Sequence, residues 1–428
     1  MVAICALALA LSAPGQTAGI SVFVDPMMAA LDLTRSQVAF AYLVATLAGS
    51  TLLPRIGRLV DEIGPRRALL IIAVGFALAL AGTSLVQGFA SLTVAFFFLR
   101  LLGQGSLPIV ASNAVAPWFV RRRGFAIGLT TAFGASLMSL VPIGSAALIR
   151  VSGWRVTWLV LAGVIALVLV PLAVRGIVDA PERLAQRPDG AAAPGIALGI
   201  APGSDPAATS TTPPTPASPA ASSAAARDVH AVSRSEALRT PAFWVLAGAV
   251  ASTGAIGTSM KFHQIALLGE QGLDPIEAAA NFLPQTAGVL LATIAGGALI
   301  DRIRLRWVLL AGMGFLVLAV TIVPSVAPGP TALVYGLLLG AAGSITRVAE
   351  AAATPKLYGL RELGAIRGVL RFVSVAASGL GPVVLAVGRD LTGSYGRTLS
   401  LMLVLPVVVA IAALFTSAGP RDGAAARR

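Results

Sequence analysis

Three arginines lie inside long apolar stretches of the chain, Arg100, Arg347 and Arg371. A charged side chain at the centre of a bilayer costs ~2.5–3.5 kcal/mol on insertion scales, so it usually faces the protein interior and has a partner there. A guanidinium group can bind a carboxylate through two parallel hydrogen bonds. We therefore predict that Arg100 and Arg371 face a central cavity and bind an organic anion. The alternative for each arginine is a structural ion pair, such as Arg347 with Glu350 on the same helix face.

Two acidic residues lie at or near membrane depth: Glu350 inside an apolar stretch, and Asp25 at the outer end of the first one. A carboxyl group in such a position can bind and release a proton. Both are therefore candidates for coupling the movement of a substrate to a proton gradient. The alternatives are that Glu350 only neutralises Arg347 and that Asp25 is a solvated end residue.

The remaining reactive side chains do not form a metal, cofactor or catalytic site. The single cysteine, Cys5, cannot close an intrachain disulfide, and the two histidines, His230 and His263, are far apart in the sequence. No phosphate-binding glycine motif and no Ser/His/Asp arrangement is visible. We predict no metal, no cofactor and no enzymatic activity.

Composition identifies the elements that must hold these charges. Hydrophobic residues make up 57% of the 428 residues and charged residues only 11%, whereas a soluble protein has about 25% charged residues. Continuous apolar runs of ~20 residues are long enough to cross a bilayer as helices, and they exclude a β-barrel, whose strands alternate. We predict twelve spans, near residues 2–27, 36–56, 68–87, 90–117, 124–149, 154–174, 241–261, 276–300, 307–326, 330–353, 364–387 and 396–417.

The basic residues are unevenly distributed. The net charge is +13, but the basic residues lie between apolar spans, so nucleic acid is not an expected partner. When the N-terminus is placed inside, most loop Lys and Arg residues fall on the cytoplasmic side, and Lys261 falls at the outer end of the seventh span. We predict a multi-pass protein of the inner (cytoplasmic) membrane, with both termini cytoplasmic and with loop arginines that face anionic lipid.

A change of composition divides the chain into two parts. Residues 201–226 consist mainly of Pro, Ala, Ser, Thr and Gly, and such a segment cannot bury enough apolar surface to fold. We predict an N-terminal six-helix bundle over residues 1–175, a disordered cytoplasmic linker over 176–240, a C-terminal six-helix bundle over 241–418 and a cytoplasmic tail over 419–428.

The two halves show an internal repeat with a shift of about 240 residues. Gly57-x-x-x-Asp61 recurs as Gly297-x-x-x-Asp301, and Gly105-Ser106 recurs as Gly343-Ser344. The shift pairs each span with the span six places later, so both halves have the same orientation. Transporters with parallel repeats of this kind bind their substrate between the halves.

The clearest motif lies in the short loop after the second span: Gly57-Arg-Leu-Val-Asp61-Glu-Ile-Gly64-Pro-Arg66-Arg67. It resembles the Gly-x-x-x-Asp-x-x-Gly-x-Arg-Lys/Arg signature of the major facilitator superfamily. The resemblance implies the major facilitator fold, an all-α integral membrane protein with twelve transmembrane helices in two parallel six-helix bundles. It also implies that this loop, with its degraded copy at Gly297 and Asp301, is a latch that holds the inner side closed. The alternative is a simple topology anchor.

Other segments resemble the prokaryotic monocarboxylate and oxalate/formate-type branch of this superfamily. They are Trp118-Phe-Val-Arg-Arg-Arg-Gly124, Phe262-His263 with Gly272-Leu273, and Gly381-Pro382 with Asp390-x-Thr-Gly-Ser-Tyr395. In addition, Arg100-Leu-Leu-Gly-Gln104-Gly105 resembles the family element Arg-x-x-Gln-Gly with one residue inserted. The resemblance implies a carboxylate substrate, and we add Gln16 and His263 to the predicted substrate-binding residues.

These observations predict a monomeric secondary active transporter that moves a small organic anion by alternating access, coupled to protons. The incomplete antiporter element at Val141-Pro142 favours symport. Spans 1, 7 and 11 are expected to bend at Pro14-Gly15, Gly254 and Gly381-Pro382. One alternative is an exporter of hydrophobic or amphipathic compounds, whose cavity would be lined by aromatic and Met side chains. Another is a non-transporting sensor with a transporter fold, which would not need the complete loop signature.

Overall fold

The computed structural model describes residues 1–119, 122–177, 232–300, 302–359 and 362–416, and within these residues every regular element is a helix. Helices satisfy all backbone polar groups internally, which lipid requires. Ten helical segments are long and apolar enough to cross a membrane. One of them, Gly124–Gly176, has 53 residues and breaks at Gly153, where φ is +77°, so it contains two spans. The shorter apolar helix Leu305–Thr321 is the ninth span in chain order and brings the number of spans to the predicted twelve.

The first six spans are built from twelve helical segments in chain order. Span 1 contains α1 (Val2–Ala10), η1 (Ala13–Gly15) and α2 (Thr17–Leu31). Spans 2 and 3 are α3 (Arg35–Ile63) and α4 (Pro65–Thr83). Span 4 contains α5 (Phe89–Phe98), η2 (Leu99–Ser106) and α6 (Leu107–Val115). Spans 5 and 6 contain α7 (Arg123–Met138), α8 (Val141–Val164), η4 (Ile165–Leu169) and η5 (Leu172–Gly176).

The last six spans follow the same plan. Span 7 contains α11 (Pro241–Phe262) and α12 (Gln264–Gly269), and span 8 contains α13 (Pro275–Ala280) and α14 (Phe282–Leu299). Spans 9 to 11 are α15 (Leu305–Thr321), α16 (Pro330–Tyr358) and α17 (Leu363–Thr392). Span 12 contains α18 (Tyr395–Met402) and α19 (Val404–Phe415).

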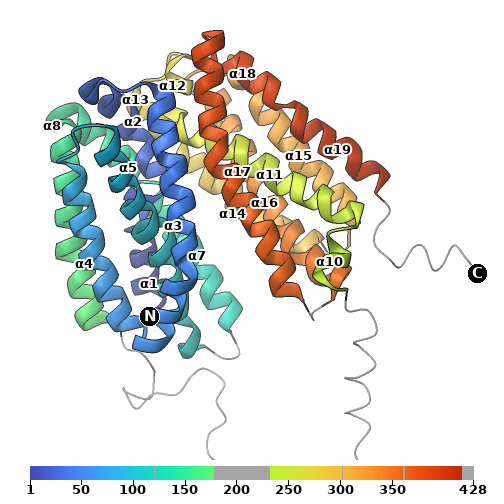
Figure 1. Ribbon diagram of the computed structural model, residues 1–428, viewed down its shortest axis with the longest axis horizontal. Coiled ribbons are helices and arrows are strands. Elements are labelled where there is room, and N and C mark those ends of the chain that lie inside the picture. The colour runs from blue at the N-terminus through green and yellow to red at the C-terminus, as the bar shows by residue number, and fades with distance from the viewer. Residues whose placement is uncertain (120–121, 178–231, 301, 360–361, 417–428) are drawn as a thin grey trace, which may run out of the picture.

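The helices of the two halves form two groups that meet at one side of the molecule and diverge toward the other (Figure 1). The side where they diverge carries the end of α3 and the short helix α10 (Arg234–Ala237), and we call it the linker side. The opposite side is called the far side. Large apolar side chains are exposed on the outside of both groups, for example Leu167 at 79% and Leu391 at 82%. A bilayer is the environment in which such a surface is stable.

The predicted tail and most of the predicted linker lie outside the described residues. The last part of that linker is helical rather than extended, because α10 begins with a capping box in which Ser233 and Glu236 exchange hydrogen bonds. These hydrogen bonds lower the pKa of the Glu236 carboxyl below its ordinary value. The backbone N–H of Arg234 donates to Glu362 at 2.6 Å. The segment before span 7 is therefore attached to the start of span 11.

The predicted bends are found at one of three positions. Span 1 is interrupted at Ala13–Gly15, as its Pro-Gly pair predicts. By contrast, α11 passes through Gly254 and α17 passes through Gly381 without a break. A Cβ on Gly381 would lie 2.2 Å from the Ala255 carbonyl oxygen, so this glycine serves close packing of spans 7 and 11. Span 7 instead turns at His263, between α11 and α12.

Candidate functional site

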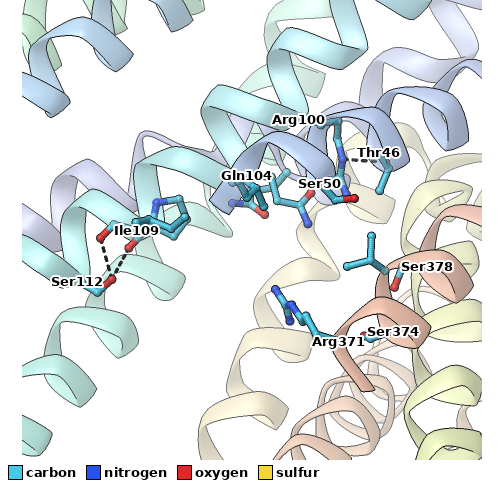
Figure 2. A pocket seen from close by; sticks show the side chains of 15 residues that line it. Thr46, Ser50, Arg100, Gln104, Ile109, Ser112, Arg371, Ser374 and Ser378 are labelled. Carbon is cyan, nitrogen blue, oxygen red and sulfur yellow. Dashed lines mark hydrogen bonds between the residues drawn. The ribbon is translucent and has the colours of Figure 1, made fainter. Parts of the chain in front are cut away.

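A cavity lies between the two groups of helices and has two sections of about 500 Å³ each. Spans 1, 2, 4 and 11 line the first section, and spans 4, 7, 9, 10 and 11 line the second. The sections form one central space because they share four residues: Gln104, Arg371, Ser374 and Ser378. Figure 2 shows Arg371, which extends from α17, on one side of this space and Arg100, Ser50 and Gln104 on the other.

The internal repeat is visible in the lining of the cavity. Gly105 of span 4 lines the first section, and its repeat-related partner Gly343 of span 10 lines the second. The two halves therefore present equivalent positions to the central space. Their side chains differ, however, because Arg100 is in the N-terminal half while Lys261, Arg347 and Arg371 are in the C-terminal half.

Arg100 is held in the first section by neutral groups, and its exposure is only 7%. Its Nε donates to Thr46 Oγ1 at 3.1 Å and its Nη1 to Thr17 Oγ1 at 3.3 Å. Its guanidinium carbon lies 4.6 Å from the ring centroid of Tyr42. Within the described part of the chain Arg100 has no carboxylate within ion-pair distance. A guanidinium carries five N–H donors, so donors remain available for an anion in the cavity.

Span 4 is π-helical over Leu99–Ser106, the segment that carries Arg100 and Gln104. A π-helix places one more residue in each hydrogen-bonded turn than an α-helix does, and such turns are frequent at functional sites. The sequence of this segment has one residue more than the family element that it resembles. We conclude that the π-helix absorbs the additional residue, so that Arg100 and Gln104 both line the cavity.

The C-terminal half contributes three cations that have no hydrogen-bond or ion-pair partner in the described residues. Arg371 lines both sections of the cavity, and Lys261 and Arg347 line the second. None of the three forms a hydrogen bond or an ion pair with a described residue. Arg347 interacts electrostatically with both Lys261 and Arg371. The three charges therefore lie near one another on the same side of the cavity.

Lys261 is a cavity residue that sequence reasoning assigned to the outer end of span 7. The structure continues this span beyond the turn at His263 as α12, which ends at Gly269. Lys261 therefore lies two turns inside the end of the span. The signal in the sequence was the apolar run Ile265–Leu268, which follows the polar residues at 263 and 264.

Glu350 is the single acidic residue among the described residues that line the cavity. It does not form the ion pair with Arg347 that was considered as an alternative. It interacts electrostatically with Arg347, Arg367 and Arg371. Arg367 is fixed to span 10, since its Nε donates to Thr354 Oγ1 at 3.1 Å and its Nη2 donates to a backbone carbonyl of that span at 2.7 Å.

Of the two residues added from the branch resemblance, Gln16 lines the first section and His263 lines neither section. Gln16 lies at the break in span 1, and its amide Nε2 donates to Ser12 Oγ at 3.1 Å. His263 is only 1% exposed, and its Nε2 lies 3.0 Å from the carbonyl oxygen of Pro382. The turn between α11 and α12 directs this ring toward span 11, where it is a packing residue in the conformation described.

Asp25 lies outside the cavity lining, at the far side. Its Oδ1 lies 2.7 Å from Nη2 of Arg35, the first residue of α3. Asp25 is therefore neither a cavity residue nor a solvated end residue without a partner. It is half-buried in an ion pair between spans 1 and 2.

Contacts between the two halves close the far side. Ser36 Oγ of α3 donates to Asp390 Oδ2 of α17 at 2.5 Å. Tyr42 of span 2 and Phe262 of span 7 have ring centroids 4.6 Å apart. A Cβ on Gly379 of span 11 would lie 2.8 Å from Leu43 Cδ1. The cavity is therefore separated from the far side, in agreement with the convergence of the helices in Figure 1.

The loop between spans 2 and 3 is a tight turn at the linker side. Gly64 has φ 81°, a conformation that glycine adopts without strain, and α4 begins at the next residue. The neighbouring Asp61 accepts a hydrogen bond from Asn113 Nδ2 of span 4 at 3.4 Å. Arg66 Nη2 donates to the carbonyl oxygen of Val174 in span 6 at 2.5 Å.

The glycines of this loop and of its copy have open space beside them. A Cβ on Gly57 or on Gly297 would meet no atom within 4 Å. Neither glycine is therefore at a close helix contact in the conformation described, in which the linker side is divergent. Arg67 is exposed, and Asp301 lies outside the described residues.

The family model described as Major Facilitator Superfamily matches residues 5–382 of the chain. The chain belongs to this superfamily. The membership confirms the family resemblance of the loop signature and the all-α membrane fold. As a major facilitator protein, the chain is a multi-pass membrane transporter of small-molecule substrates and not an enzyme.

Solved structures agree with this major facilitator fold. The chain is similar to a bacterial homologue of the human lysosomal transporter Spinster in an inward-facing, occupied conformation, with a TM-score of 0.66 and 14% identity over 96% of this chain and 95% of that one. The unoccupied inward-facing form of that homologue gives a TM-score of 0.63 and 16% identity over 97% of this chain and 95% of that one. Identities this low concern the fold alone.

A curated relative resembles part of the chain. The probable sulfoacetate transporter SauU of Cupriavidus necator is 27% identical over 138 residues, which are 31% of this chain and 30% of that protein. The match therefore spans less than a third of either protein.

Proposed function

We propose that this chain is a secondary active transporter that moves a small organic anion, such as a carboxylate, across the cytoplasmic membrane by alternating access. The observation that carries the proposal is the charge of the cavity. Arg100 and Arg371 line its first section from opposite halves, and neither forms an ion pair with a carboxylate among the described residues. Guanidinium groups that form no ion pair within the protein at membrane depth are suited to binding a carboxylate.

The curated relative supports an anionic substrate. Its name assigns it sulfoacetate, and this small molecule carries a carboxylate and a sulfonate group. The match is short, so it supports the class of substrate rather than its identity.

The lining of the cavity gives no support to an exporter of hydrophobic compounds. Such a cavity is expected to offer aromatic and Met side chains. The described residues that line the two sections include neither kind, whereas they include serines, threonines and two glutamines as well as the cations. Polar donors of this type orient a small charged ligand.

Proton coupling through Glu350 is part of the proposal. This carboxyl lines the cavity beside Arg347, Arg367 and Arg371, so its protonation and the binding of an anion influence each other. Asp25 is the weaker candidate because it lies in an ion pair with Arg35. We further propose that the transporter is a monomer of the inner membrane with cytoplasmic termini, and that its bundles have the boundaries given above.

The proposed function is tested by uptake of a labelled carboxylate panel into proteoliposomes, with and without an imposed pH gradient. Arg371→Gln is the informative variant, because this side chain is exposed to the cavity and removal of its charge leaves no buried group unpaired. We expect its KM for the transported anion to rise about tenfold to thirtyfold, the value of one charge-assisted hydrogen-bonded contact. Unchanged affinity for the transported anion would exclude Arg371 from the anion site.

The loop after span 2 is proposed to act as the latch on the linker side. Asp61→Asn removes the negative charge in the last turn of α3, beside Asn113 of span 4, but keeps the size of the side chain. We expect the transport rate to fall about tenfold, because the latch contacts that form on closure are charge-assisted. Membrane insertion, measured as the amount of monodisperse protein, is expected to be unchanged. Wild-type transport at equal expression would contradict the latch and favour a topology anchor.

A further inference from the structure

The cavity carries more positive charge than a single carboxylate neutralises. Among the described residues that line its two sections, five side chains are cationic and one is acidic. The cations are Arg100, Lys261, Arg347, Arg367 and Arg371, and the acid is Glu350. Arg367 is bonded to span 10, whereas the other three cations of the C-terminal half form no hydrogen bond or ion pair with a described residue. Glu350 is the one described carboxylate that acts electrostatically on Arg347 and Arg371. Charges at membrane depth normally have partners, so the missing negative charge is expected in the substrate.

The cations are divided between the two halves of the transporter. Arg100 lines the first section together with Gln104, both on span 4. Lys261 and Arg347 line the second section from spans 7 and 10, and they interact electrostatically with each other. Arg371 lines both sections and lies between these two groups. The cavity thus offers two separate positions for an anionic group, one in each half.

We infer that the substrate is a small dianion, whose two anionic groups are carboxylates or a carboxylate and a sulfonate. One group binds at Arg100, Gln104 and Arg371, and the other binds at Lys261 and Arg347. This inference rests on the proposed function, because it specifies the charge of the anion bound in the same cavity. The relevant structural feature is the second cluster, Lys261 with Arg347, which a monoanion held by Arg100 and Arg371 leaves unneutralised.

The dianion also explains how binding favours closure of the cavity. When the halves approach and water leaves, repulsion between unneutralised cations becomes stronger because the local dielectric constant falls. A ligand with a negative group at each end offsets this repulsion and contacts both halves in the closed state. Since a ligand shifts a conformational equilibrium only through its differential affinity for the two states, a monoanion bound to one half has less effect. Monoanions are therefore expected to bind without efficient transport.

The test compares anions of matched chain length on the purified protein. The probes are succinate against butyrate and sulfoacetate against propionate, with binding measured by the ligand-induced rise in Tm and transport measured by uptake into proteoliposomes. We expect each dianion to bind at least about tenfold more tightly than its matched monoanion, the ratio that one additional charge-assisted contact provides. Only the dianions are expected to accumulate. Equal affinities, or a preference for the monoanions, would overturn the inference.

The variants Lys261→Gln and Arg347→Gln identify the second position. We expect the preference for dianions to fall to about twofold or less in each, because loss of the second position weakens dianion binding more than monoanion binding. Arg239→Gln, at an exposed position before α11, is the matched control and is expected to keep the full preference. Retention of the full preference in both cavity variants would overturn the assignment of the second position.

The two proposals fail in different ways. If neither dianions nor monoanions bind or accumulate, the cavity is not an anion site and both proposals are wrong. If both classes bind equally and monoanions are transported, the proposed function stands and the dianion inference is wrong. The wild-type comparison needs no variant, so the inference is decided even where a substitution prevents folding.

Discussion

Substitution of Arg100 by glutamine is expected to reduce kcat/KM for the transported anion by about thirtyfold to a hundredfold, which corresponds to about 2–3 kcal/mol of lost binding. The guanidinium lies on the face of Tyr42 and donates to Thr46 and Thr17, so its orientation is fixed before an anion arrives. A preorganised donor contributes more than a mobile one, because less freedom is lost on binding. Arg100→Lys keeps the charge but lacks the planar fork, and we expect it to recover only part of the activity.

Arg155 provides a matched control for this substitution. Its guanidinium also lies on an aromatic ring, 4.2 Å from the centroid of Trp154, and its Nη1 donates to the carbonyl oxygens of Ser84 and Val86 at 2.8 and 2.9 Å. It does not line either section of the cavity. We expect Arg155→Gln to lower Tm and leave KM unchanged, whereas Arg100→Gln impairs transport of the anion itself. Transport within twofold of wild type in Arg100→Gln would remove this residue from the anion site.

The sequence was sufficient to predict the membrane fold, because the physical constraint behind it is local. A helix needs ~20 apolar residues to cross a bilayer, and this requirement can be read from each segment separately. The boundaries were less certain where a span is interrupted. Span 7 was predicted to end at residue 261, but the structure continues it to Gly269 after a turn at His263. Because of that difference, Lys261 lies in the cavity rather than at the outer end of the span.

The partners of the charged residues could not be predicted from the sequence, because they depend on how the spans pack. The spacing of Arg347 and Glu350 on one helix suggested an ion pair, but no such pair forms among the described residues. Asp25 was considered as a coupling residue or a solvated end residue, and in the structure it forms an ion pair with Arg35. His263 was assigned to substrate binding on a resemblance, and its ring contacts Pro382 instead.

The glycines illustrate the same limit. Gly254 and Gly381 were predicted as points of bending, since glycine weakens a helix. In the structure both helices continue, and the glycines allow spans 7 and 11 to approach each other closely. A Cβ on Gly254 would lie 3.0 Å from the Ser374 carbonyl oxygen. Sequence alone does not distinguish a glycine that bends a helix from a glycine that admits a neighbour.

Alternating access predicts that the far side must open during transport, and a cross-link there is expected to stop it. Ser36 Oγ and Asp390 Oδ2 are 2.5 Å apart and belong to different halves. The double variant Ser36→Cys, Asp390→Cys can be joined by a short thiol-reactive cross-linker. The single native cysteine, Cys5, is buried, so reaction elsewhere is limited. We expect transport to fall at least about twentyfold in the cross-linked protein, because one half can no longer move away from the other.

The cross-link must block movement rather than damage the fold, and a second pair separates these effects. Thr293 Oγ1 and Ser344 Oγ are 2.6 Å apart, and both belong to the C-terminal half. Cross-linked cysteines at these two positions are expected to leave transport near the level of the uncross-linked variant, since the half moves as a unit. If the cross-linker is attached through disulfide bonds, its removal by a reductant should restore transport in the variant with the far-side pair. The variant with the far-side pair could instead transport at full rate while it is cross-linked. The contact between positions 36 and 390 would then persist throughout the cycle, and the rocking of two bundles about this cavity would not be the mechanism.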